Sequence, residues 1–136
     1  MQPVLVQVSV GELLDKLVIM ELKTLRIPGE QKQRNIREEL ALLQQSFAEL
    51  ALSVDGLDML INNLRQVNSE LWDIEDNIRA CEKQQRFDHE FIALARSVYL
   101  KNDERAALKR SINELCGSRL REEKYYTEYT LAEPMA

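Results

Sequence analysis

The feature that most constrains the fold of this chain is an apolar stripe between residues 57 and 86. Its apolar positions step alternately by three and four residues, the spacing that keeps one side of a helix against a partner helix. The stripe comprises Leu57, Leu60, Leu64, Val67, Leu71, Ile74, Ile78 and Cys81. This pattern predicts a long helix with a coiled-coil-like seam, and the rest of the chain must supply its partners.

The start of the chain carries a clear helix signal. Ser9 and Glu12 fit a capping box, in which the Ser9 hydroxyl accepts from the Glu12 N–H and the Glu12 side chain reaches back. A first helix is therefore predicted to begin near Val10. It ends at Ile27, because Pro28 and a glycine follow and cannot continue a helix.

Three more helices are predicted from capping residues and apolar spacing. A helix over residues 31–53 is followed by a Val-Asp-Gly turn, so it should form an antiparallel hairpin with the helix of residues 57–86. A last helix begins after Asp88 and closes at Gly117. Asn102 offers an internal cap, so this helix is either continuous or split there.

Two stretches near the ends of the chain have strand-like composition. Residues 3–8 alternate Val4, Val6 and Val8 on one side of an extended segment, and residues 125–131 are rich in tyrosine and threonine. A lone strand is not stable in water. We therefore expect these two segments to pair, within one chain or between subunits.

Composition bounds the class of protein. The 136 residues suggest a single domain over 1–136, and the net charge of −5 argues against nucleic-acid binding, which needs a basic field. No stretch approaches the ~18 apolar residues of a membrane span. The start of the chain lacks a basic, apolar signal segment, so a cytoplasmic location is expected. Cys81 and Cys116 form no zinc spacing, and no metal or cofactor motif is present.

Charged side chains fall on or beside the predicted apolar stripes. If the helices pack together, acids from the first and third helices could meet bases from the third and fourth, with every member of the network paired. One interpretation is a set of ion pairs that fixes helix or subunit register. The other is a small anion pocket with basic donors and a glutamate as orienter or acid/base group. The candidate residues are Glu21, Glu75, Arg79, Arg105 and Lys109.

Four aromatic residues are candidates for an interface. Trp72 lies beside the stripe of the third helix, where it is either a core-edge residue or an anchor facing a partner. Tyr125, Tyr126 and Tyr129 cluster in the last segment, and polar-tipped aromatic clusters suit interfaces. The long helices also leave more apolar edge than three neighbours easily cover, which favours a homodimer.

Six short stretches of the sequence carry a resemblance to a known family. They are Val8 to Lys16, Glu21 to Lys23, Leu71 to Arg79, Ala95 to Tyr99, Asn102 to Lys109, and Glu122 to Lys124. Together they resemble a family of small uncharacterised bacterial helical domains that sometimes occur with glycosyltransferases and other surface-polysaccharide genes. The resemblance implies a bacterial cytoplasmic protein and a polysaccharide-assembly context. It supplies no catalytic residue.

The sequence thus predicts an all-α antiparallel four-helix bundle with short extended segments at both ends. The favoured function is a non-catalytic protein-interaction or accessory module that works through a helical face and the tyrosine-bearing segment. The alternative is a small anionic-ligand-binding or enzymatic bundle that uses Glu75, Arg79, Arg105 and Lys109. Whether the chain is an enzyme is left open at this point.

Overall fold

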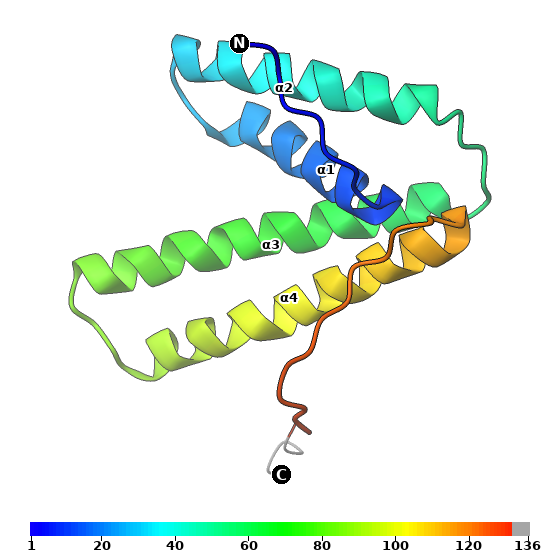
Figure 1. The fold of residues 1–136 in the computed structure, drawn as a ribbon. Helices are drawn as coiled ribbons and strands as arrows, with labels where there is room; N and C mark the ends of the chain where they lie inside the picture. Colours follow the sequence, from blue (N-terminus) through cyan, green and yellow to red (C-terminus); the bar gives the residue numbers. More distant parts are fainter. Residues whose placement is uncertain (132–136) are drawn as a thin grey trace.

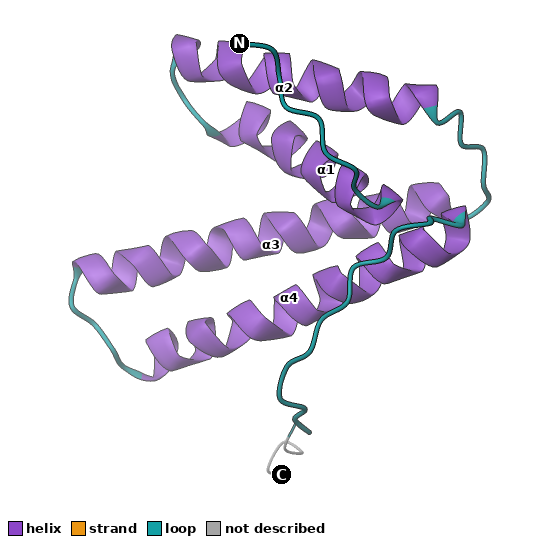
Figure 2. Cartoon of the chain, viewed as in Figure 1, coloured by secondary structure: helices purple, strands orange, loops and turns teal. Residues whose placement is uncertain are grey.

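The computed structural model describes residues 1–131, which contain four α-helices and no β-strand (Figure 2). The helices are α1 (Val10–Arg26), α2 (Glu30–Glu49), α3 (Leu57–Lys83) and α4 (His89–Cys116). The predicted all-α bundle of four helices is confirmed. Within the described part of the chain, no helix is long and apolar enough to cross a membrane.

The helices form two antiparallel hairpins, α1 with α2 and α3 with α4 (Figure 1). Helix α1 lies against both helices of the second hairpin. The predicted hairpin between residues 31–53 and 57–86 is wrong, because the backbone of α2 runs beside α1 and not beside α3. The reason lies in the linker. The helix ends at Glu49, and left-handed turns at Ala51 and Gly56 redirect the chain before α3 begins.

The core sits where α1, α3 and α4 meet. Its fully buried members are Leu14, Val18, Leu57, Ile61, Leu64, Val67 and Ile112. The predicted stripe of α3 is buried at Leu57, Leu64, Val67 and Leu71, half-buried at Leu60, Ile74 and Ile78, and buried again at Cys81. Ile61 lies beside that stripe and is also buried, because α3 is covered by two helices and its apolar face is wider than a two-helix seam.

The backbones of α1 and α4 approach each other closely at Gly11. A Cβ built there would lie 2.5 Å from the Lys109 carbonyl oxygen and 2.9 Å from Asn113 Oδ1. The Gly11 N–H donates to Asn113 Oδ1 at 2.7 Å, and the N–H of the preceding residue, Val10, donates to the Ser118 hydroxyl at 3.2 Å. Only glycine allows the two backbones to come this close. This contact fixes where the first turn of α1 meets α4.

Helix starts follow the predicted caps. Ser9 accepts from the Glu12 N–H at 3.1 Å and Asp88 accepts from the Phe91 N–H at 3.3 Å. The capping box is incomplete, however, because the Glu12 side chain turns to Lys109 of α4 instead of back to its own backbone. Helix α4 is continuous through Asn102.

Neither predicted strand pairing forms within the described chain. Residues 1–8, the N-terminal segment, and residues 119–131, the tail, are extended and largely exposed. Their bases lie close together, since Arg119 Nη2 donates to Gln7 Oε1 at 3.4 Å. From there the N-terminal segment crosses α1 and α2, while the tail turns the other way along α4 (Figure 1).

Candidate functional site

A buried carboxylate lies at the centre of the molecule. The Asp15 side chain, on α1, is 1% exposed. Arg105 of α4 donates to it through Nε at 3.0 Å and through Nη2 at 2.5 Å, and Asn68 of α3 donates through Nδ2 at 2.9 Å. Two donors from two helices therefore satisfy one buried acid, and the three helices are tied together at this point.

Lys109 extends this cluster from the core to the tail. Its Nζ atom lies 2.6 Å from Glu12 of α1, 2.8 Å from Glu122 of the tail and 3.9 Å from Asp15. Its side chain is only 8% exposed. In the described part of the chain, every buried side-chain nitrogen and oxygen has a hydrogen-bond partner. We call Glu12, Asp15, Arg105, Lys109 and Glu122 the ionic cluster.

The contacts within the ionic cluster favour the charged forms of Arg105, Lys109 and Glu122. The hydrogen bond with Asp15 raises the pKa of Arg105. Burial lowers the pKa of Lys109, but its hydrogen bonds with Glu12 and Glu122 outweigh that effect and the pKa is raised overall. Hydrogen bonds from Lys109 and then Lys124 lower the pKa of Glu122 to about 2. Each of these shifts moves the pKa of its group further from neutral pH.

The tail is attached to α4 at two points and leaves a hollow between them. One attachment is the ion pair of Glu122 with Lys109. At the other, the Tyr129 hydroxyl donates to Asp103, and its ring stands edge-to-face on Tyr99 with centroids 5.5 Å apart. The hydrogen bond with Asp103 raises the pKa of Tyr129 to about 12.

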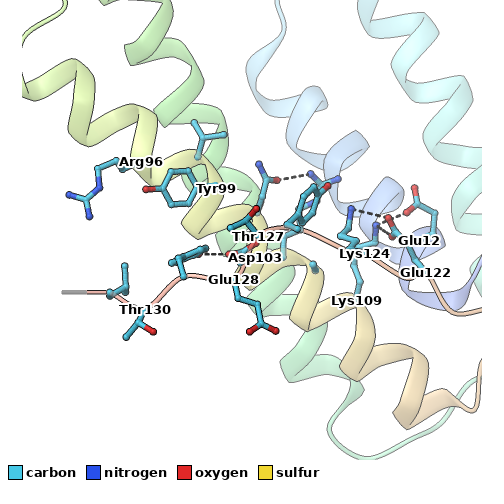
Figure 3. Close-up of a pocket in the computed structure, with 17 residues that line it drawn as sticks. Glu12, Arg96, Tyr99, Asp103, Lys109, Glu122, Lys124, Thr127, Glu128 and Thr130 are labelled. Carbon is cyan, nitrogen blue, oxygen red and sulfur yellow. Dashed lines mark hydrogen bonds and ion pairs between the residues drawn. The ribbon is translucent and has the colours of Figure 1, made fainter. Parts of the chain in front are cut away.

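The hollow between the two attachments, here called the tail groove, has a volume of about 1570 Å³ (Figure 3). Its lining mixes aromatic, hydroxyl and charged side chains from α4 and the tail, with Glu12 entering from α1. Four of the lining side chains are cationic and four are anionic. They are Arg96, Arg105, Lys109 and Lys124, and Glu12, Asp103, Glu122 and Glu128.

The balance of charges limits what the tail groove can hold. Because the formal charges cancel and most are already paired, no net field favours a highly charged anion. Three acids lie around the Lys109 ammonium group and are neutralised in part by it. Among residues 1–131, no group of three or more His, Cys, Asp or Glu side chains is placed to hold a metal ion.

Comparison with known protein families gives a match over nearly the whole chain. A family model described as a family of unknown function, DUF6165, matches residues 4–135. The chain belongs to the DUF6165 family. No curated protein and no solved structure matches it.

The structure brings together two of the five predicted charged residues. Arg105 and Lys109 both belong to the ionic cluster, whereas Glu21 pairs with Arg65 of α3 on the surface, with 2.8 Å between Oε2 and Nε. The expectation that Glu21 joins an interior network is therefore corrected. It lies on the edge of α1 that faces α3, where Arg65 reaches it from the solvent side.

Glu75 and Arg79 do not join that network either. They form a pair within α3 at 3.9 Å, and their side chains are 49% and 79% exposed. The predicted grouping with Arg105 fails for a geometric reason. The core residues that α3 packs against α1 lie in the first half of α3. The second half of α3 is covered by α4 alone, so the flank of α3 that carries Glu75 and Arg79 faces water.

Sequence reasoning missed the central acid, Asp15, together with Glu122. The wheel of α1 places Asp15 with Glu12 on a polar face, and that face is the one that meets α4. A signal was present, because Gly11 lies one turn before Asp15 on the same side of the helix. A glycine at that position indicates a close helix contact. Asn68 was visible as a polar residue on the stripe of α3.

The four predicted interface residues separate into two places. Trp72 is half-buried on α3 beneath Arg26, whose guanidinium carbon lies 5.6 Å from the ring centroid, and it does not line the tail groove. Tyr126 and Tyr129 line the tail groove. Tyr125 is adjacent to them but lies outside the lining and is fully exposed.

Proposed function

We propose that this DUF6165 chain is a non-catalytic protein-interaction or accessory module, and that the tail groove receives an extended segment of a partner protein. The observation that carries the proposal is the attachment of the tail at both ends, by Glu122 and by Tyr129, with exposed aromatic and hydroxyl groups between. A segment that is held at two points presents its side chains with little further loss of conformational freedom on binding.

The pKa shifts favour a binding role over proton transfer. A general acid or base works best with a pKa near the working pH. Here the pKa of Glu122 is lowered to about 2 and that of Tyr129 is raised to about 12, so both keep one protonation state around neutrality. Lys109 and Arg105 are likewise held as cations.

The lining favours a peptide over a small multivalent anion. Arg105 and Lys109, the strongest anion donors in reach, already bind Asp15, Glu12 and Glu122. Apart from Arg96 at the outer end, what remains available is a set of tyrosine rings, threonine hydroxyls and amides, which suits backbone groups and side chains of mixed character. The groove is also longer than a compact ligand needs, since it follows the tail from residue 122 to residue 131.

The wider setting of the proposal comes from the sequence resemblance. We propose a bacterial, cytoplasmic protein that acts as an accessory in surface-polysaccharide assembly, with a second copy of the chain as one partner. The resemblance of the six quoted stretches supports the setting. The extended, uncovered segments at both ends support the second copy.

The proposal is tested with two adjacent tyrosines. Full-length tagged chain is produced in cells of its source organism and crosslinked, and recovered proteins are quantified for the wild type, Tyr126→Ala and Tyr125→Ala. Tyr126 lines the tail groove and Tyr125 does not, although both are exposed tyrosines on the same tail. We expect a partner whose recovery falls at least about fivefold, or ~1 kcal/mol, with Tyr126→Ala only.

The control variant makes the result decisive. Equal recovery of every enriched protein with both variants, or no enrichment over untagged cells, contradicts a groove-binding module. The crosslinked contact must also map to the lining of α4 or of the tail. Contacts confined to α2 would place the working surface elsewhere and would also contradict the proposal.

A second candidate function is binding of a small anion. The observation in its favour is Arg96, which lines the outer end of the tail groove and makes no ion pair among residues 1–131 (Figure 3). A thermal-shift screen with anionic metabolites and nucleotide sugars tests it. A shift that disappears in Arg96→Gln supports this alternative, and no shift with any ligand rejects it.

A further inference from the structure

The accessible surface of the chain is larger than its mass explains. A folded monomer of 15.8 kDa is expected to expose about 7,300 Å². This chain exposes 10256 Å². The difference of about 2,900 Å² exceeds the ~800 Å² that each partner contributes to a stable interface. The chain therefore has enough uncovered surface for a partner that it meets over a long contact.

Much of the uncovered surface belongs to the two extended segments. In the N-terminal segment Val4, Leu5 and Val6 are 81%, 93% and 75% exposed. Among residues 1–131, the backbones of residues 2–8 and 121–131 take part in no backbone–backbone hydrogen bond. Both segments are rich in the β-branched and aromatic residues that strands favour. Two lengths of chain are thus ready to pair as strands and lack partners within one copy.

The directions of the two segments show which partner fits. Their bases meet at the start of α1 and the end of α4, where Arg119 donates to Gln7, and from there they run away from each other (Figure 1). A two-fold axis near this point places the N-terminal segment of a second copy along the tail of the first copy. The same axis places the N-terminal segment of the first copy along the tail of the second. The N-terminal segment runs towards the axis and the tail runs away from it. Each N-terminal segment is therefore antiparallel to the tail that it meets.

We propose that two copies of this chain form a homodimer by reciprocal strand pairing, with residues 3–8 of each copy added to the tail of the other. The contact is isologous, as a two-fold interface must be, and it closes without leaving a third segment to bind. It goes beyond the groove-binding function, because it uses the edge of the tail that is turned away from α4.

Charge does not oppose this pairing. Residues 2–8 carry no charged side chain, whereas the tail carries three bases and three acids, namely Arg119, Arg121, Lys124, Glu122, Glu123 and Glu128. An N-terminal segment laid along the tail therefore brings no like charges into contact. The pairing also covers the side chains of Val4 and Val6.

Analytical ultracentrifugation of the full chain tests the dimer. Val6→Pro removes a ladder N–H in the middle of the N-terminal segment, while Val6→Thr keeps the shape and the strand preference. Val6 lies outside the core, so both variants fold. We expect the dimer dissociation constant to rise at least about tenfold with Val6→Pro and to stay within about threefold with Val6→Thr. A wild-type chain that stays monomeric over the concentration series overturns the proposal.

A mixing experiment tests which segments meet. In a Cys116→Ser background, one tagged chain carries Val6→Cys and a second carries Thr127→Cys, and each is oxidised alone and in mixture. We expect an interchain disulfide in the mixture and little in either chain alone. A Val6→Cys chain that crosslinks efficiently with itself shows pairing of like segments and overturns the proposal. So does a dimer that gives no crosslink in the mixture.

Discussion

At the scale of single residues, Asp15 is the member of the ionic cluster on which the others depend. It is the acid with the least exposure to water, and it accepts from Arg105 and Asn68 while lying 3.9 Å from Lys109. A buried ion pair adds little net stability when complete, but removal of one partner leaves the other charge uncompensated. The cluster therefore acts mainly to specify how α1, α3 and α4 are placed.

Asp15→Asn should lower the free energy of unfolding by about 3–5 kcal/mol, because it leaves the Arg105 guanidinium without its carboxylate. Urea denaturation followed by circular dichroism measures the loss. Glu21→Gln is the matched control, since it breaks the surface pair with Arg65, and its effect should stay below about 1 kcal/mol. Similar losses in the two variants would contradict a central role for Asp15.

Glu122 should make stability depend on pH in the acid range. Its pKa falls from 4.5 to about 2 on folding, so its contribution is present above the unfolded value and is lost as pH drops from about 5 to about 2. We expect the stability difference between wild type and Glu122→Gln to shrink over that interval. Glu123→Gln, one residue away, should show no such change. If the difference in stability between wild type and Glu122→Gln stayed constant over this pH interval, the ion pair of Glu122 with Lys109 would be contradicted.

At the scale of helices, local signals were readable and partner choice was not. Ser9 and Asp88 marked the starts of α1 and α4, because a cap depends only on neighbours in the chain. The choice of α1 as the partner of α2 depends on backbone turns at Ala51 and Gly56. The spacing of apolar residues does not reveal such turns, so the wrong hairpin was predicted. Asp15 was missed for the same reason, since its polar face became an interior face only once α4 packed on it.

Gly11 tests the contact between α1 and α4. In an open helix, alanine in place of glycine would stabilise by about 1 kcal/mol. At this position the added Cβ would lie 2.5 Å from the Lys109 carbonyl oxygen, so the helices must separate. We expect Gly11→Ala to destabilise by about 1–3 kcal/mol in chemical denaturation. A stabilised variant would show that the close approach is not needed.

At the scale of the whole molecule, the helices act as a support for two extended segments. The predicted all-α bundle was correct, yet both segments expected to pair as strands stand apart within one chain. Their sequences indicated strand preference, but a single sequence does not show which copy supplies the partner strand. The tail differs from the N-terminal segment, because Lys109 and Asp103 hold it against α4.

We infer that the ionic cluster orders the tail and so forms the tail groove. Backbone NMR order parameters of residues 123–128 measure this order in wild type, Glu122→Gln and the control Glu123→Gln. Glu122→Gln leaves Lys109 paired with Glu12, so the fold is retained. We predict values near 0.8 in the wild type and the control, and below about 0.6 in Glu122→Gln. A tail that is equally mobile, or equally ordered, in all three proteins would contradict the claim.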